Sequence, residues 1–335
     1  MKCTMCIKDE YRDWYRKDMD FGDFKRIVPL LKNVQSVVLE GWGESLLYKH
    51  LIECILLVRQ EGTGVGFVTS GMGLTEEYAK DLIAAGIDFI GFSLSGTTGR
   101  THNAIRVNSD LDALINSMTL MKRLADEKGM TKPAMHIVYL MLRENIHEVP
   151  SVIDLAGTIG IREVILINIV HITNTRQDKE RVFTCEEKNY EPYQEILTEA
   201  RKRAQRHGIN LSLPSLRPRD VAICAENPLR NLYISADGEI SPCVYLGPPI
   251  GSPFKRIFCG EEHVTERVSF GNIFREPVEE IWNKKEYTTF REHFKKRERF
   301  SAALYESLTD MKRIETISYP DPPQPCVTCH KIKGF

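Results

Sequence analysis

The sequence predicts an α/β protein built on a parallel β-sheet and followed by a smaller domain. Three observations support this prediction. Short apolar runs alternate with amphipathic helical stretches, glycine and polar residues follow the apolar runs, and cysteines cluster near both ends of the chain. Alternation of strand and helix at this spacing is typical of βα units, whose strands pair in parallel.

The first two thirds of the chain contain the βα pattern. Apolar runs predict five strands, at 37–39, 65–68, 89–94, 135–142 and 164–170. Amphipathic periodicity predicts helices at 51–58, 76–85, 111–124 and 190–207, and glycine just past a periodic stretch is a normal helix stop. Glycine and polar residues gather after the strands, so we expect ligand-binding groups at the carboxyl edge of the sheet.

The sequence changes character after Gly208. Residues 212–253 are rich in proline and glycine, and a hairpin is expected over 232–243, turning on Asp237-Gly238. Residues 276–299 are predicted to be helical, and 300–324 to be a charged linker. We therefore expect two domains, at 1–210 and 211–335.

Composition narrows the class of protein. The 335 residues carry a net charge of −1 and are 42% hydrophobic, which is ordinary for a soluble globular protein. No apolar run approaches the roughly 20 residues that a membrane span needs, and no signal peptide is visible. The basic run at 295–299 lacks interleaved aromatic residues. We expect a cytoplasmic protein that binds neither nucleic acid nor membrane.

Nine cysteines are many for such a chain, and two pairs have Cys-x-x-Cys spacing, Cys3/Cys6 and Cys326/Cys329. Disulfides are disfavoured in the cytosol, so clustered cysteines there indicate metal binding or catalysis. Each pair alone fits zinc, an iron–sulfur cluster or a redox pair. Cys54 lies in an apolar helical stretch and is expected in the core, whereas Cys185 has no partner in sequence.

Two segments together indicate a family. Cys3-Thr4-Met5-Cys6 precedes a strand that ends in Gly41-Trp42-Gly43-Glu44-Ser45. These segments resemble the C-x3-C-x2-C motif and the Gly-Gly-Glu-Pro-like motif of radical S-adenosylmethionine (SAM) enzymes, with departures at Trp42 and Ser45. Cys3 and Cys6 correspond to the second and third cysteines. The first would stand four residues before Cys3, so we expect the sequence to lack that cysteine and the family's first strand.

The resemblance implies a partial (β/α)6 barrel without its first strand, and an enzyme that reductively cleaves SAM to a 5′-deoxyadenosyl radical. It implies a [4Fe–4S] cluster on Cys3 and Cys6. The residues implied to contact SAM are Gly41, Gly43, Glu44, Thr69, Ser70, Ser93, Ser95 and Arg106. An arginine suits bidentate contact with a carboxylate such as that of SAM. Each of these residues, taken alone, is also explained by loop packing, and no catalytic side chain is assigned.

A second resemblance lies near the C-terminus. Cys224, thirteen residues, Gly238, four residues and Cys243, followed later by Cys326-x-x-Cys329, resemble the SPASM and twitch domains of radical SAM proteins. This implies one auxiliary [4Fe–4S] cluster on Cys224, Cys243, Cys326 and Cys329. A zinc ion on the same thiols is the structural alternative. Cys259 is either a substitute ligand or a free thiol.

The substrate is less constrained. The Gly-Trp-Gly-Glu variant, the segment 241–246 and the short Cys-x-x-Cys tail resemble maturases associated with tungsten-dependent oxidoreductases. This implies a protein or metal–pterin cofactor as substrate and a ferredoxin or flavodoxin as electron donor. The alternatives are modification of a ribosomally made peptide and, if the first cysteine is absent, a non-catalytic iron–sulfur or zinc protein. His136 and His171 either face the reaction chamber or are structural, and His102 is expected to be structural.

Overall fold

The structure is a computed structural model, and it describes residues 2–186, 191–251, 253–307 and 319–335. Its largest sheet has six parallel strands in the order β2-β3-β4-β6-β7-β8. They are β2 (Ser36–Val38), β3 (Gly64–Thr69), β4 (Phe89–Leu94), β6 (Ala134–Met141), β7 (Glu163–Asn168) and β8 (Asn210–Ser212). Five correspond to the predicted runs. The sequence did not reveal β8, because three residues are too few to show a pattern.

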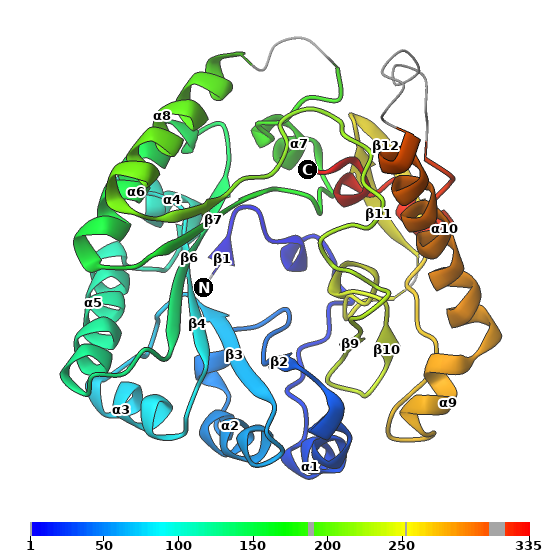
Figure 1. Cartoon of the computed structure of the whole chain (residues 1–335), viewed down its shortest axis with the longest axis horizontal. Helices are drawn as coiled ribbons and strands as arrows, with labels where there is room; N and C mark the ends of the chain where they lie inside the picture. The colour runs from blue at the N-terminus through cyan, green and yellow to red at the C-terminus, as the bar shows by residue number, and fades with distance from the viewer. Residues whose placement is uncertain (1, 187–190, 252, 308–318) are drawn as a thin grey trace.

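Helices cover the outer face of this sheet (Figure 1). Two short helices, α4 (Gly99–Ile105) and α7 (Thr175–Glu180), follow β4 and β7. The helices on the outer face are α1 (Phe21–Ile27), α2 (Leu51–Gln60), α3 (Glu76–Ala84), α5 (Leu111–Glu127), α6 (Val149–Ile159) and α8 (Glu191–His207). The main core lies between them and the strands, and includes the fully buried Phe67, Phe92 and Ile137. The open arc of βα units confirms the predicted α/β fold of partial-barrel type.

The beginning of the chain lies inside the curve of the sheet, facing the C-terminal domain (Figure 1). There β1 (Lys2–Cys3) pairs antiparallel with β5 (Arg106–Val107), which places Cys3 opposite Arg106. The ladder continues as the amide of Thr4 donates to the carbonyl of Ile105 at 2.9 Å. A segment from the very start of the chain is thus fastened beside the end of α4.

In the described residues of the C-terminal domain there are two small antiparallel hairpins and two α-helices. The elements are β9 (Tyr233–Ile234), β10 (Ile240–Ser241), β11 (Phe254–Phe258), β12 (Glu261–Thr265), α9 (Val278–Asn283) and α10 (Lys285–Ser307). The β9–β10 hairpin turns at Gly238 as predicted, with a φ of 84° that favours glycine. Ile240, Tyr287 and Phe294 are fully buried in this domain's core.

One sequence-based expectation for this domain was confirmed and one was wrong. Residues 276–299 are helical as predicted, in the two helices α9 and α10, but α10 continues to Ser307, so the linker does not begin at residue 300. The apolar face of α10, which includes Phe290 and Phe294, packs into the domain core and holds the helix together. The part of the predicted linker at 308–318 lies outside the described residues.

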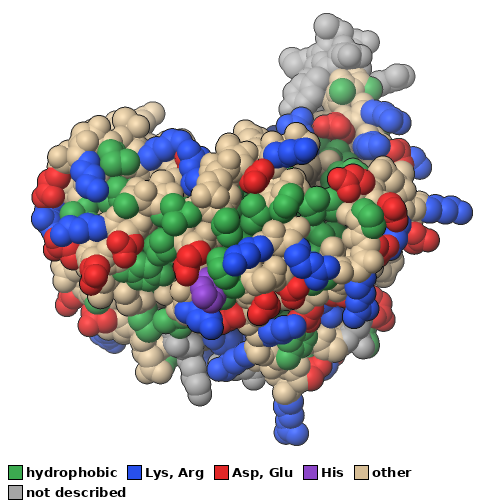
Figure 2. Space-filling view, turned by 90° about the horizontal axis from the view of Figure 1, so that it is seen from below, with side chains coloured by type: hydrophobic (Ala, Val, Ile, Leu, Met, Phe, Trp, Pro, Cys, Tyr) green, Lys and Arg blue, Asp and Glu red, His purple; other side chains and the backbone are tan. Residues whose placement is uncertain are grey.

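Basic and acidic side chains are interspersed on the face of the molecule seen in Figure 2, in keeping with the net charge of −1. Among the helices of the described ranges, none combines the length and apolar character needed to cross a bilayer.

Candidate functional site

The carboxyl ends of β2 and β3 meet through Glu44. Its Oε1 accepts a hydrogen bond from Thr69 Oγ1 at 2.5 Å, and its Oε2 accepts from the backbone amide and hydroxyl of Ser70 at 2.8 and 2.6 Å. Thr69 and Ser70 are both buried. The Gly-Trp-Gly-Glu and Thr-Ser-Gly segments therefore form one unit, as expected where the carboxyl ends of parallel strands adjoin.

Gly41 and Gly43 lie on either side of Trp42 in the loop after β2. A Cβ at Gly43 would meet no atom within 4 Å, so this stretch of backbone is open to close approach by a ligand. A Cβ at Gly41 would lie 3.5 Å from the hydroxyl of Tyr233 in the C-terminal domain. This loop therefore lies where the two domains meet.

Arg106 connects the loop after β4 with the N-terminal cysteines. Its Nε donates to Ser95 Oγ at 2.8 Å, and its backbone pairs with Cys3. Burial lowers the pKa of Arg106, while the nearby Cys3, Glu44 and Cys6 oppose that shift. The structure thus brings five of the predicted site residues close together, namely Cys3, Cys6, Glu44, Ser95 and Arg106.

Cys3 and Cys6 occupy a tight turn in which the amide of Cys6 donates to the carbonyl of Cys3 at 3.0 Å. Both side chains are half-buried. Ser93 lies on β4, opposite Val138 of β6, and is half-buried. The assignment of the predicted residues as cluster and SAM ligands stays a prediction, which their common neighbourhood supports.

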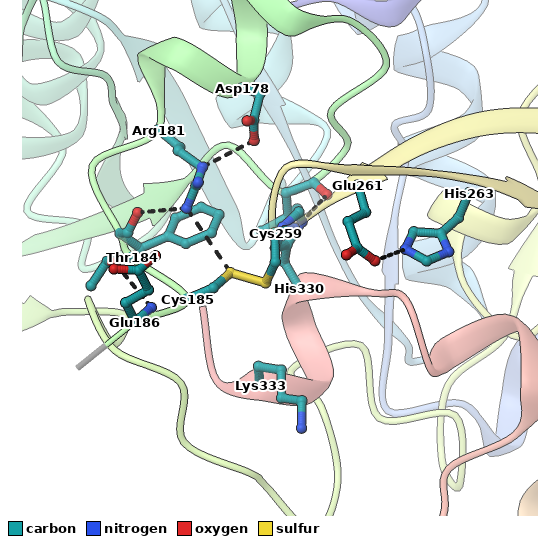
Figure 3. The surroundings of a disulfide bond; sticks show 12 residues. Asp178, Arg181, Thr184, Cys185, Glu186, Cys259, Glu261, His263, His330 and Lys333 are labelled. Atoms are coloured by element: carbon teal, nitrogen blue, oxygen red, sulfur yellow. Dashed lines mark hydrogen bonds and ion pairs between the residues drawn. A yellow bond between two sulfur atoms is a disulfide. The ribbon is translucent and has the colours of Figure 1, made fainter. Parts of the chain in front are cut away.

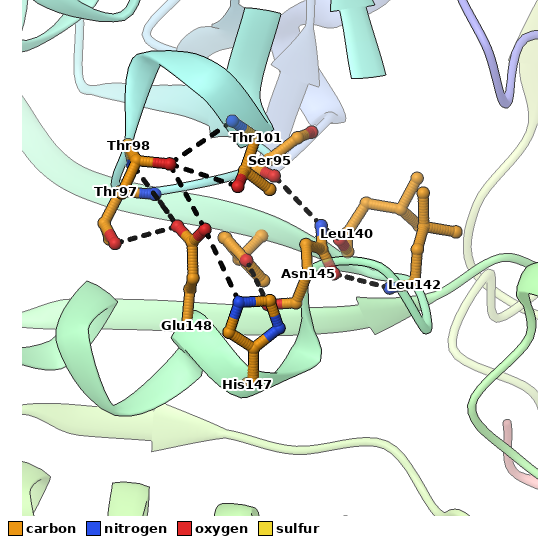
Figure 4. Close-up of polar contacts among 10 residues, drawn as sticks. Ser95, Thr97, Thr98, Thr101, Leu140, Leu142, Asn145, His147 and Glu148 are labelled. Atoms are coloured by element: carbon orange, nitrogen blue, oxygen red, sulfur yellow. Dashed lines mark hydrogen bonds and ion pairs between the residues drawn. The ribbon is translucent and has the colours of Figure 1, made fainter. Parts of the chain in front are cut away.

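Sequence reasoning missed the groups that hold the loop after β4 (Figure 4). Asn145 is fully buried, and its side-chain Nδ2 donates to the backbone carbonyls of Ser95 and Leu140 at 3.0 and 2.9 Å. Its Oδ1 accepts from the backbone amide of Leu142 at 2.7 Å. Its position directly after a predicted strand was the available signal. His102 accepts from the amide of Ser95 at 3.2 Å, which bears out the structural interpretation of that histidine.

Glu148 holds the same loop from the other side (Figure 4). Its Oε2 accepts from the hydroxyl of Thr97 at 2.9 Å and from the amide of Thr98 at 3.3 Å. Burial opposes ionisation, but hydrogen bonds from Thr101, Thr97 and Thr98 outweigh it and hold the pKa of Glu148 below its usual value. This carboxylate remains charged at neutral pH and positions the loop that carries Ser95.

In the C-terminal domain the four predicted cysteines line one cavity. Cys224, Cys243, Cys326 and Cys329 surround it. Burial raises the pKa of Cys224 to about 11, and the charge of Cys329 adds to that shift. Burial also raises the pKa of Cys243 and of Cys326, again with contributions from the other thiols. Four half-buried thiols around one cavity, three of them with raised pKa values, suit a metal centre, because its positive charge replaces their protons.

An aromatic junction, which we define as Trp42, His171 and Tyr245, lies between the glycine-rich motif and this cavity. The ring centroid of His171 is 5.7 Å from that of Trp42 and 6.1 Å from that of Tyr245, and Tyr245 also lines the cavity. Burial lowers the pKa of His171 to about 3, so its ring is neutral. Among the described residues, neither ring nitrogen of His171 nor Nε1 of Trp42 has a hydrogen-bond partner.

His136 behaves differently from His171. Its ring lies over Gly91, on the neighbouring strand β4, and 6.3 Å from the ring centroid of Phe89. This arrangement supports the structural interpretation for His136. The unpartnered ring of His171 at the junction instead supports a place in the reaction chamber.

Comparison with known families decides what these centres are. The model of the radical SAM superfamily matches residues 1–156, and the model of the SPASM iron–sulfur cluster-binding domain matches residues 224–304. The chain belongs to the radical SAM superfamily. Its cofactors are accordingly a [4Fe–4S] cluster with SAM and an auxiliary iron–sulfur centre. The four thiols of the C-terminal cavity fit the auxiliary centre, and Cys3 and Cys6 offer two thiolates to the SAM cluster, because thiolates are the usual ligands of such clusters.

Curated relatives resemble this radical SAM enzyme along most of its length. The tungsten-containing aldehyde ferredoxin oxidoreductase cofactor-modifying protein of Pyrococcus furiosus is 23% identical over 295 residues, covering 87% of this chain and 80% of the relative. A probable GTP 3′,8-cyclase of Methanococcus maripaludis is 24% identical over 251 residues, covering 73% of this chain and 80% of that protein.

Solved structures share the fold. SuiB of Streptococcus suis bound to S-adenosylmethionine matches 87% of this chain with a TM-score of 0.62 and 14% identity. The chain spans 64% of the length of SuiB. The enzyme anSMEcpe, with bound AdoMet and a peptide, matches 88% of this chain and 79% of its own with a TM-score of 0.60 and 15% identity. At these identities the likeness concerns the fold.

Two further cysteines correct the sequence-based interpretation. Cys185 and Cys259 are joined by a disulfide with a Cα–Cα distance of 5.6 Å, so Cys185 has a partner and Cys259 is neither a free thiol nor a ligand of the four-cysteine cavity (Figure 3). Seventy-four residues separate them in sequence. No local pattern could have revealed this pairing, because it depends on how the β11–β12 hairpin packs against the barrel.

Proposed function

We propose that this enzyme modifies a tungsten–pterin cofactor, or the protein that carries it, by SAM-dependent radical chemistry. The observation that carries the proposal is the match to the cofactor-modifying protein of Pyrococcus furiosus, which covers 87% of this chain and 80% of that protein. A match of that length takes in most of the barrel and a large part of the C-terminal domain. A second relative is named for chemistry on GTP, which is also a fused heteroaromatic compound.

The arrangement of the side chains supports a SAM half of the site. Cys3 and Cys6 would hold the cluster, the open backbone at Gly43 would receive SAM, and Arg106 would contact the carboxylate of SAM. When bound, the cluster and SAM supply a 5′-deoxyadenosyl radical by reductive cleavage. Glu44 keeps Thr69 and Ser70 beside the glycine-rich loop, and Ser95 orients Arg106.

The substrate half is the aromatic junction. Aromatic side chains pack favourably against a flat ring system, which a pterin has. The indole N–H of Trp42 can donate to a ligand, and a neutral His171 offers one donor and one acceptor. These groups can pair with the alternating donors and acceptors at the edge of a pterin.

The decisive experiment measures 5′-deoxyadenosine formed by the full-length protein under anaerobic conditions with SAM and a low-potential reductant. We expect its rate to rise when the tungsten–pterin cofactor released from an oxidoreductase is added. The His171→Phe variant should need about tenfold more of this cofactor for the same stimulation, because it loses both ring nitrogens. Stimulation by a precursor peptide and not by the cofactor would refute the proposal.

A second candidate is the modification of a ribosomally made peptide. Its support is the shared fold with SuiB, which has been solved bound to its precursor peptide SuiA, and 23% identity over 257 residues to a PqqA peptide cyclase of Methylobacterium nodulans. Mass spectrometry of the added peptide after turnover distinguishes the two functions. A loss of two hydrogen masses in the peptide, which marks a new cross-link, would favour this candidate.

A further inference from the structure

Three side chains outside both predicted centres meet at the seam between the domains. Cys185 follows α7, Cys259 lies in the turn between β11 and β12, and His330 lies directly after the auxiliary-cluster cysteine Cys329 (Figure 3). One ligand atom from each, two sulfurs and a ring nitrogen, all lie within 4.8 Å of one another. Among the described residues, these three form the group of His, Cys, Asp and Glu side chains whose ligand atoms lie this close together.

The ring of His330 is held in the orientation that a metal ligand requires. It is fully buried between Phe183 and Phe258, whose ring centroids lie 4.9 and 5.0 Å away. Its Nδ1 lies 3.2 Å from the carbonyl of Val170 and donates to it, because a carbonyl can only accept. The lone pair is therefore on Nε2, which accepts from the amide of Cys259 at 3.4 Å and so faces the cysteines. Metal-binding histidines usually donate their other nitrogen to such a carbonyl.

A cation favours thiolates at the same place. Arg181 Nη1 lies 4.0 Å from the sulfur of Cys185, and its Nε is fastened to Asp178 Oδ1 at 2.9 Å (Figure 3). A fixed positive charge beside a cysteine stabilises its anion, and the thiolate is the form that binds metals. Once the disulfide is reduced, the site thus offers two sulfurs and one neutral imidazole.

We propose that Cys185, Cys259 and His330, with their disulfide reduced, bind one soft divalent cation of the zinc type, separately from the iron–sulfur centres. An external dithiol carries out the reduction. Its two thiols become a disulfide, its two electrons break the Cys185–Cys259 bond, and its two protons pass to the cysteines and leave when the metal binds. Two cysteines and one histidine are ligands that zinc favours.

The site would fasten three distant parts of the chain together. Cys185 belongs to the barrel, Cys259 to a hairpin of the C-terminal domain, and His330 to the tail that also carries Cys326 and Cys329. A bound metal therefore holds the tail that supplies two ligands to the auxiliary cluster. We expect its removal to make the iron of that cluster easier to lose.

The test uses the full-length protein, purified anaerobically with a dithiol reductant, incubated with Zn²⁺ and then desalted. Zinc and iron are measured in the same sample by mass spectrometry of the elements. We expect about one zinc per chain that the Cys185→Ala/Cys259→Ala double variant does not retain. Cys54→Ala is the matched control, since Cys54 is buried in α2 and is not one of the three proposed zinc ligands. This variant should keep the zinc.

The single variant Cys185→Ala guards against a folding defect, because Cys185 is half-buried and its loss removes one ligand only. It should retain iron while losing at least about tenfold in zinc affinity. Three outcomes would overturn the proposal. They are no zinc on the reduced unmodified protein, as much zinc on the double variant, and a Cys185–Cys259 disulfide that survives the dithiol.

Discussion

The two Cys-x-x-Cys segments adopt the same backbone turn in different surroundings. In each, the amide of the second cysteine donates to the carbonyl of the first at 3.0 Å, in Cys3/Cys6 and in Cys326/Cys329. The first turn lies beside Arg106, which also interacts electrostatically with Glu44. The second lies in a cavity that two more cysteines, Cys224 and Cys243, complete.

This difference indicates how one motif serves two purposes. Beside Cys3 and Cys6 there are polar groups able to hold an outside ligand such as SAM, so this centre is suited to chemistry. Around Cys326 and Cys329 the protein supplies a full set of four thiols, so this centre is suited to structure or electron transfer. The surroundings of the turn, and not the turn itself, decide the role.

The largest effect is expected at the first turn. Cys3→Ala and Cys6→Ala in the full-length protein should reduce 5′-deoxyadenosine formation to background, because the SAM cluster loses a ligand. Iron bound at the auxiliary centre should remain, which iron and sulfide analysis will show. Retained SAM cleavage in either variant would contradict the assignment of these cysteines.

The second turn should behave in the opposite way. Cys326→Ala removes one of the four thiols of the cavity, so about four irons per chain should be lost. Slow cleavage of SAM in the absence of substrate should persist, since the first turn is untouched. If that cleavage disappears as well, the two centres are not as separate as their surroundings indicate.

An intermediate effect is expected for Glu44→Gln. The variant keeps the size of the side chain but loses the negative charge that accepts from Thr69 and Ser70. Charge-assisted hydrogen bonds contribute about 1.5–3 kcal/mol each, so the KM for SAM should rise about tenfold or more. The matched control is Glu53→Gln, because Glu53 lies on the exposed side of α2 and the same substitution there should leave the KM for SAM unchanged. An unchanged KM would show that Glu44 does not organise the SAM site.

The smallest effect concerns stability and pH. The folded-state pKa of Glu148 lies below its ordinary value of 4.5, so its contribution to stability is present above that value and lost as pH falls through the folded pKa. Glu148→Gln should therefore lower the free energy of unfolding by about 1–3 kcal/mol at pH 7. The difference between the two proteins should shrink below pH 4.5, which denaturation at both pH values will measure. A constant difference would mean that hydrogen-bond geometry, and not charge, holds the loop.

Much of the fold was predictable because its signals are local. The strand at 89–94 was predicted with the bounds that the structure has, and helix 76–85 with an end one residue beyond Ala84. Alternating apolar and polar residues reveal such elements without knowledge of their neighbours. The extension of α10 to Ser307 was missed. Phe300 in this extension contacts the ring of Tyr319, and a contact between residues so far apart in sequence leaves no local pattern.

The sequence by itself determined the family and the order of the βα units, and it predicted the two sets of cysteines as cluster ligands, because motif residues keep their spacing along the chain. Tertiary structure decided which side chains meet. It joined Glu44 to Thr69 and Ser70, placed His171 between Trp42 and Tyr245, and brought Cys185 to Cys259 and His330. Contacts between residues so far apart depend on how sheet, hairpin and tail pack, and packing leaves no pattern in any short stretch of sequence.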